Sequence, residues 1–149
     1  MRSGEKFTMS TLKQTAERFI KSVKPGQGWE AWQPFCHSDA GFRKLGTSAV
    51  GMEVHESLPE FAEPTKVLVA LFPDLRKELR SLAVDEEQDI AIAYMVTKGT
   101  HTGEGGPVPP TGKAFEVDVV WVMQFEEDRM RHLTLVMHDL VVDKQPGWV

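Results

Sequence analysis

The chain has 149 residues, of which 41% are apolar and 26% are charged, and its formal net charge at pH 7 is -5. That composition is typical of an ordinary water-soluble globular protein, and it excludes the collagenous, low-complexity and disulfide-rich classes. The Lys and Arg residues are scattered rather than gathered in a basic stripe, so we expect no nucleic-acid partner.

The sequence has no apolar run of the roughly 20 residues that cross a bilayer, and its opening stretch MRSGEKFTMSTLKQ has no hydrophobic segment of signal-peptide type. We therefore expect a cytoplasmic protein without a membrane partner. Because Cys36 is the only cysteine, the sequence excludes intrachain disulfides and thiolate-rich zinc sites. No repeat or linker divides the chain, which predicts a single domain over residues 1–149 with residues 1–9 as an extended or disordered leader.

Helical patterns dominate the first half of the chain. Apolar positions between residues 11 and 23 fall on one helical stripe, which opens at a Thr11/Gln14 capping box and ends at Pro25-Gly26. A short helix around residues 29–35 and a strand beginning near residue 42 are expected next. Residues 52–72 have a helical pattern interrupted by two prolines, which predicts a broken helix whose clearest piece covers 65–71.

The second half of the chain has the composition of strands. Four segments rich in β-branched and apolar residues are expected to form strands at about 76–86, 89–101, 114–126 and 130–142. Helices followed by a run of strands predict an α+β domain in which the helices cover one face of a mostly antiparallel sheet.

The last two strands are expected to form a hairpin that turns at Glu127-Asp128, so that the numbers of paired residues sum to 255. Asp139 would then lie opposite Glu116, with Asp118 as a diagonal neighbour on the same face. That predicted face carries Glu116, Asp118, Val120, Val122, Gln124, Leu133, Leu135, Met137, Asp139 and Val141. His138 would point to the other face, which carries Trp121, so His138 and Asp139 should not form a catalytic pair.

A carboxylate among apolar neighbours loses hydration, which makes it harder to ionise and suits it to acid/base work near neutral pH. Asp139 is therefore a candidate general acid/base. The alternative is a partly hydrated carboxylate at a strand end that accepts backbone hydrogen bonds. His101 lies at the start of the loop GTHTGEGGPVPPTGK, where it either lines a cavity or caps the loop backbone. That loop lacks the spacing and the following helix of a phosphate cradle.

Other candidate groups point to no metal and no cofactor. The five histidines have no spacing typical of a metal site, and the word CHSD at 36–39 is expected to be satisfied locally. The aromatic residues Trp29, Trp32, Phe35 and Trp121 are suited either to the core or to the wall of a cavity for a hydrophobic ligand.

Several segments of the sequence resemble those of a known family. FPDLRKEL, DIAIAYMVTKGTHTGE and PPTGK, with a last strand that ends in an apolar run plus Asp, resemble the SnoaL-like polyketide cyclases of the nuclear transport factor 2-like superfamily, over residues 10 to 142. The resemblance implies a cone-shaped α+β fold with a strongly curved sheet that encloses a pocket. It also implies homodimers through the outer sheet face and an aldol condensation without metal or cofactor. Asp139 matches the family's acid/base, and His101 is the next position carried over.

The leading hypothesis is therefore a cyclase or isomerase acting on a hydrophobic carbonyl compound. Asp139 would abstract a proton, and a neutral Asp118 or Glu116, or His101, would donate a hydrogen bond to the resulting enolate. The expected pocket lining is Trp32, Leu135, Met137, Val120 and Glu116. The alternatives are a non-catalytic binding module for a small apolar ligand and an epoxide hydrolase of limonene type.

Overall fold

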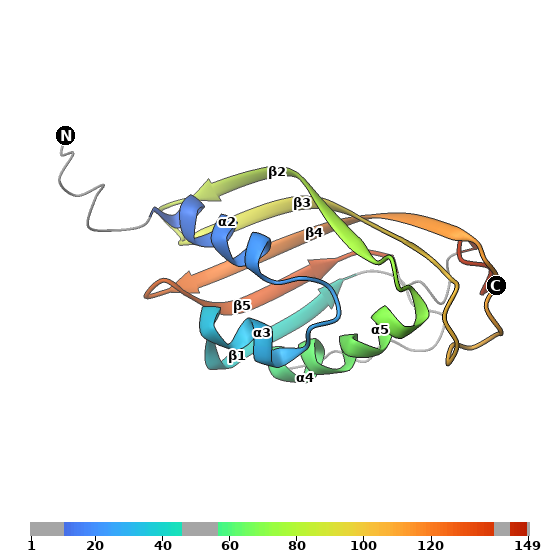
Figure 1. The fold of residues 1–149 in the computed structure, drawn as a ribbon. Helices are drawn as coiled ribbons and strands as arrows, with labels where there is room; N and C mark the ends of the chain where they lie inside the picture. Colours follow the sequence, from blue (N-terminus) through green and yellow to red (C-terminus); the bar gives the residue numbers. More distant parts are fainter. Residues whose placement is uncertain (1–10, 46–56, 139–143, 149) are drawn as a thin grey trace.

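The computed structural model describes residues 11–45, 57–138 and 144–148 of the chain. Its helical elements are α2 (Leu12–Ser22), α3 (Trp29–Trp32), η1 (Gln33–Phe35), α4 (Leu58–Ala62), η2 (Glu63–Thr65) and α5 (Lys66–Leu71). Its strands are β1 (Cys36–Leu45), β2 (Arg76–Asp85), β3 (Ile90–Thr100), β4 (Ala114–Glu126) and β5 (Arg129–Val136). The helices lie on one side of a curved five-stranded sheet (Figure 1).

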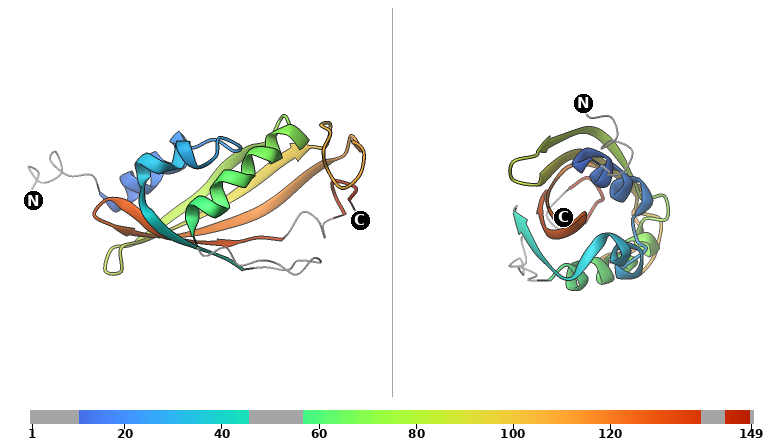
Figure 2. Two further views of the ribbon diagram at one scale, coloured as in Figure 1. Left: turned by 90° about the horizontal axis from the view of Figure 1, so that it is seen from below. Right: turned by 90° about the vertical axis from the view of Figure 1, so that its left-hand side faces the viewer.

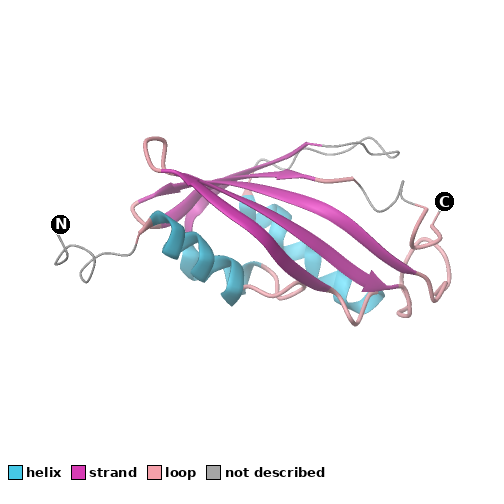
Figure 3. Ribbon diagram, turned by 90° about the horizontal axis from the view of Figure 1, so that it is seen from above, coloured by secondary structure: helices cyan, strands magenta, loops and turns pink. Residues whose placement is uncertain are grey.

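The strands form one sheet in the order β1-β5-β4-β3-β2. Only the β1–β5 pair is parallel, and the other three pairs are antiparallel. All the helices pack on the same face of the sheet (Figure 3), and the end-on view shows how strongly the sheet curls around that face (Figure 2). The predicted α+β class with a mostly antiparallel curved sheet is confirmed.

Local sequence signals explain where the helices begin and break. Thr11 accepts a hydrogen bond from the Gln14 backbone N–H at 3.1 Å, and the Gln14 side chain accepts one from the Thr11 N–H at 2.9 Å, which is the predicted capping box. Pro59 lies in the first turn of α4, and Pro64 lies in the η2 turn that separates α4 from α5. The prolines therefore divide the helical segment as predicted. Among the described residues, no helix is long and apolar enough to span a bilayer.

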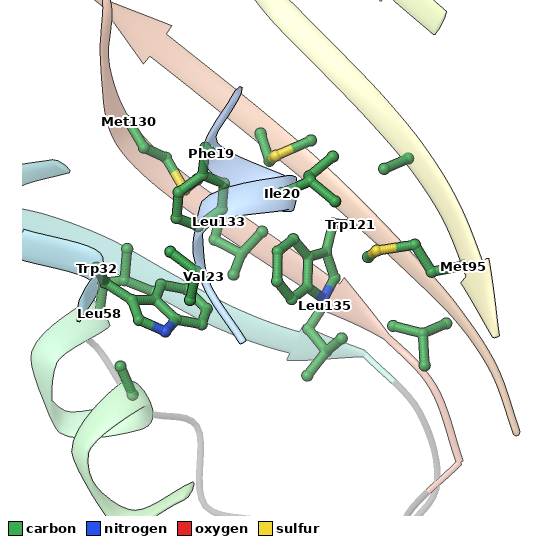
Figure 4. Close-up of a cluster of buried hydrophobic side chains, with 14 of the residues drawn as sticks. Phe19, Ile20, Val23, Trp32, Leu58, Met95, Trp121, Met130, Leu133 and Leu135 are labelled. Atoms are coloured by element: carbon green, nitrogen blue, oxygen red, sulfur yellow. The ribbon is translucent and has the colours of Figure 1, made fainter. Parts of the chain in front are cut away.

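The core fills the space between the helices and the concave face of the sheet. Trp32 from α3, Phe19 from α2 and Trp121 from β4 pack together, with ring centroids 5.3 Å apart for Phe19–Trp32 and 5.5 Å apart for Trp32–Trp121 (Figure 4). Leu133 and Leu135 of β5 lie beside them (Figure 4). This cluster ties the helical layer to the two central strands.

The β4–β5 hairpin turns at Glu127-Asp128, as predicted. Both residues have positive φ, 54° and 64°, and Glu126 pairs with Arg129 across the turn. The numbers of paired residues sum to 255 only next to the turn. Arg131 is an extra residue in β5, between the pairs Phe125–Met130 and Gln124–His132, and it shifts the register there. This is a β-bulge, and beyond it the numbers of paired residues sum to 256.

The bulge overturns the predicted face assignment. A shift of one residue moves a strand's whole side-chain set to the opposite face. Leu133, Leu135 and Met137 therefore lie on the buried face with Trp121, while Glu116, Asp118 and Val120 lie on the outer face. The exposed His138 also lies away from the aromatic face predicted for it.

The guanidinium of Arg131 contacts Asp39 of β1 at 2.9 Å, and this hydrogen bond lowers the pKa of the Asp39 carboxyl. The ion pair gives the extra residue a partner on the neighbouring strand.

Candidate functional site: an apolar cavity beside Lys77

An apolar cavity of about 130 Å³ lies between the concave sheet face and the helices. Its wall is formed by the loop after α2, by α3, α4 and α5, and by the inner faces of β2 to β5. The lining residues are Val23, Lys24, Pro25, Gly26, Trp32, Phe61, Thr65, Leu68, Phe72, Leu75, Lys77, Thr97, Phe115, Val117, Val119, Trp121, Leu135 and Met137. Convergence of strands and helices on one concave apolar space is typical of small-molecule sites.

The size of the cavity limits what it can hold. A protein cavity of about 150 Å³ lined by apolar side chains binds benzene. The cavity here is slightly smaller, so it accommodates one ring or a short apolar chain, and because it is partly open to solvent a larger ligand would extend out of it.

Lys77 contributes a charged side chain to this apolar wall. It lies on β2 opposite Thr97 of β3, and Thr97 also lines the cavity. A second bulge at Arg80 shifts the β2–β3 register, so Lys77 before the bulge and Leu82 after it both face inward. The strand geometry therefore fixes an amine against the helical layer.

The surroundings of Lys77 make its ammonium form less stable than that of an ordinary lysine. Burial is the main cause that lowers the pKa of this amine to about 8, and the nearby positive charge of Lys24 lowers it further. The Nζ atom donates to the Val23 carbonyl oxygen at 3.4 Å and lies 4.2 Å from the centre of the Trp121 ring. The ring face favours the ammonium form and partly offsets the effect of burial. Within the described ranges, no carboxylate forms an ion pair with Lys77.

A groove of about 350 Å³ adjoins the cavity. It is lined by Ile20, Lys21, Val23, Lys24, Pro25, Leu75, Arg76, Lys77 and Leu79. Lys77, Lys24 and Leu75 belong to both spaces, so the amine lies where the groove meets the apolar cavity. A ligand that enters through the groove would pass cations before it reaches the apolar space.

The predicted pocket residues divide between the two faces of the sheet. Trp32, Leu135 and Met137 line the cavity. Val120 and the exposed Glu116 lie on the outer face of β4. The prediction that Val120 and Glu116 line the pocket is wrong, because it assumed a β4–β5 hairpin without the bulge.

The carboxylates named as catalytic candidates are not at the described cavity wall. Asp118 is exposed on the outer face, where it accepts a hydrogen bond from the Tyr94 hydroxyl at 2.8 Å. Asp118 therefore does not lie on the pocket face predicted for it, and its predicted closeness to Asp139 stays a prediction. Asp139 lies outside the described residues. Among the described lining residues there is no carboxylate, and the cations are Lys24 in the loop after α2 and Lys77 on β2.

His101 holds the long loop and the C-terminal segment together. Its fully buried ring does not belong to the cavity lining, although Phe72, which does, packs against it at 5.6 Å between ring centroids. The Trp148 indole N–H and the Thr111 backbone N–H both donate to Nδ1, at 3.1 and 3.3 Å. Because both groups can only donate, Nδ1 is the acceptor and the neutral ring carries its proton on Nε2. Of the two roles left open by the sequence, the geometry supports the capping of the loop.

Replacement of Trp148 by Phe should lower the free energy of unfolding by about 1 kcal/mol, because it removes the hydrogen bond to His101 while it keeps the stacking on Phe72. Urea denaturation measures the loss. A double-mutant cycle with His101→Leu should give a coupling of about 1 kcal/mol, and a coupling near zero would contradict this role of the indole.

The segment CHSD does not form a nucleophilic or metal site. Burial raises the pKa of the Cys36 thiol to about 12, so it stays protonated. His37 Nε2 lies 2.8 Å from the carbonyl oxygen of Glu126 at the β4–β5 turn. No three His, Cys, Asp or Glu side chains converge within the described residues.

Sequence reasoning missed Lys77. A signal was present, because the alternation in LRKEL places Lys77 on the same strand face as Leu75 and Leu79. A charged residue at an apolar position of a strand is a candidate for a functional group.

Comparisons with known proteins agree with the fold. The family model of the SnoaL-like polyketide cyclases matches residues 14–145. AclR from Streptomyces galilaeus, a candidate hydroxylase, has a TM-score of 0.69 at 18% identity over 91% of this chain and 81% of that chain. A candidate SnoaL-like polyketide cyclase from Jannaschia sp. CCS1 has a TM-score of 0.67 at 20% identity, over 91% of this chain and 92% of that chain. IdmH from Streptomyces antibioticus, a candidate polyketide cyclase, has a TM-score of 0.66 at 20% identity, over 85% of this chain and 91% of that chain. No curated protein matches the chain in sequence.

Proposed function

Because the chain belongs to the SnoaL-like polyketide cyclase family, we propose that it catalyses proton transfer at the carbon next to the carbonyl group of a small apolar compound. In this proposal Asp139 is the general acid/base and Lys77 binds the carbonyl oxygen. The reaction class is that of a cyclase or isomerase. The observation that carries the proposal is the apolar cavity of about 130 Å³ with the Lys77 amine in its wall.

The chemistry requires a base and a partner for negative charge. Abstraction of the α proton moves an electron pair toward the carbonyl oxygen, which becomes an enolate. A cation or hydrogen-bond donor in a low-dielectric site stabilises that oxygen much more than it would in water. Lys77 is suited to this role because its ammonium form, held against Trp121, has no carboxylate partner among the described residues.

The assignment of the base rests on the family resemblance and on sequence spacing. Asp139 follows the cavity residue Met137 by two positions, and it matches the acid/base aspartate of the family. Asp118, Glu116 and His101 are not used in the proposed mechanism, because two lie on the outer face and the third holds the loop.

Deuterium exchange tests the proposal. The protein is incubated with acetophenone or cyclohexanone in D2O, and NMR follows the loss of the α-proton signal. We expect exchange above the rate with buffer alone, and filling the cavity with a Val119→Phe substitution should suppress it. Binding of these ketones without any exchange would instead support the binding-module alternative. The epoxide-hydrolase alternative needs an arginine between two acids, and the described lining contains neither.

We also propose a homodimer through the outer sheet face. The pairs Ile92–Val122, Tyr94–Val120 and Val120–Val136 place apolar side chains side by side across β3, β4 and β5. Ile92, Tyr94 and Val136 are 43%, 40% and 37% exposed, so this patch is available to a second copy.

A charged substitution in the patch tests the dimer. Ile92→Glu is expected to give a monomer in analytical ultracentrifugation, because it places a charge within the apolar patch. Val67→Glu is the matched control, since Val67 is also exposed, at 53%, but lies on α5. A wild-type protein that sediments as a monomer at high micromolar concentration would contradict the proposal.

A further inference from the structure

We propose that Lys77 is also a nucleophile that forms an imine with small apolar aldehydes and ketones bound in the cavity. This activity goes beyond the proposed acid–base function, because it needs only the amine and the cavity and does not require Asp139. The class of ligand is a carbonyl compound with one ring or a short chain, as the cavity of about 130 Å³ dictates.

The contacts of Lys77 leave its amine available for reaction. Its Nζ atom has a long hydrogen bond of 3.4 Å to the Val23 carbonyl oxygen and a 4.2 Å contact to the Trp121 ring. Other lysines are held by carboxylates: Lys66 lies 2.7 Å from Glu63, and Lys98 lies between Glu78 and Glu116 at 3.3 and 3.4 Å. An ion pair stabilises the ammonium form, which has no lone pair to donate.

The fraction of neutral amine is much larger at Lys77 than at an ordinary lysine. Its pKa of about 8, lowered by burial and by Lys24, leaves about a fifth of the amine neutral at pH 7.4. At a pKa of 10.5 the neutral fraction would be about 0.1%, so the fraction of neutral amine is roughly 200 times larger at Lys77. Desolvation of this kind is a recognised way to activate a lysine toward carbonyl compounds.

The chemical step balances without any further reactant. The Nζ lone pair attacks the carbonyl carbon, and a proton moves from nitrogen to oxygen to give a carbinolamine. Loss of one water molecule then forms the C=N bond. The apolar lining, which includes Phe72, Val117 and Val119, limits the access of water that would reverse the step.

Reductive trapping of the wild-type protein is the test. Benzaldehyde is added with sodium cyanoborohydride at pH 7.4, which reduces the imine to a stable secondary amine, and peptide mapping by mass spectrometry locates the benzyl group. We expect Lys77 to be modified at least tenfold faster than Lys98. The rate at Lys77 should rise with pH around a midpoint near 8 and level off about one pH unit above it, as the neutral fraction of its amine does.

Variants separate this proposal from the acid–base function. Lys77→Arg keeps the charge and should abolish the fast modification, whereas Lys98→Arg should leave it unchanged. Trapping is measured on the wild-type chain and does not depend on turnover, so a failure of the acid–base proposal does not affect this readout. Equal modification rates at Lys77 and the surface lysines of the wild-type chain would overturn the inference, whether or not Lys77→Arg folds.

Discussion

Asp139→Asn is expected to lower the rate of α-deuterium exchange by about 10³-fold while it leaves ketone binding within about twofold of the wild type. A positioned general base contributes about 10² to 10⁴ in rate, and an amide of the same shape cannot accept the proton. Binding should persist because the described cavity wall, including Trp32, Trp121 and Leu135, is unchanged by the substitution. NMR measures the exchange and the binding on the same samples.

Asp118→Asn is the matched control for this experiment. Asp118 is a carboxylate on the outer face of β4, where it accepts the Tyr94 hydroxyl, so its replacement should change exchange by less than about twofold. If Asp118→Asn lost activity as much as Asp139→Asn, or if Asp139→Asn retained the wild-type rate, the assignment of the base would be wrong.

Lys77→Met is expected to raise the free energy of unfolding by about 2 kcal/mol at pH 7. Lowering of the Lys77 pKa from 10.5 to about 8 on folding corresponds to about 3 kcal/mol of destabilisation when the amine is protonated. Lys77 is only partly buried, so solvent screens part of this cost. Met has a similar length and no charge, so it removes the cost of burying the cation.

The difference between Lys77→Met and the wild type should depend on pH in a defined direction. The folded protein binds fewer protons at Lys77 than the unfolded chain, so the wild type gains stability as the pH rises from about 8 to 10.5. The increase in the free energy of unfolding caused by Lys77→Met should therefore have its full size below pH 8 and vanish above pH 10.5. Urea denaturation at pH 7 and pH 10.5 measures it, with Lys98→Met as the control. A constant difference across this range would contradict the buried amine.

Local signals predicted most of the fold. The Thr11/Gln14 capping box and the prolines at 59 and 64 act within a few residues, so the sequence could place α2 and the break between α4 and α5. β4 matches the predicted 114–126 because its alternation of buried and exposed positions is regular. The turn at Glu127-Asp128 was predicted because it is the one polar cluster between two apolar strands.

The site depends on features that the sequence does not encode locally. The bulge at Arg131 is supported by Asp39 on another strand, and it decides which side chains face the cavity. The role of His101 depends on Trp148, which is 47 positions away along the chain. Lys77 could have been found from its apolar strand neighbours, but its lowered pKa requires the packing of α2 and Trp121 around the amine.

The central claim is that the cavity beside Lys77 binds small carbonyl compounds, and the four tryptophans provide the most direct test. Trp32 and Trp121 line the cavity, whereas Trp29 and Trp148 do not belong to its lining. In a ¹H–¹⁵N NMR titration with acetophenone, the indole signals of Trp32 and Trp121 should shift together with one dissociation constant, and those of Trp29 and Trp148 should stay in place. Shifts of all four signals, or of none at millimolar ligand, would contradict the account.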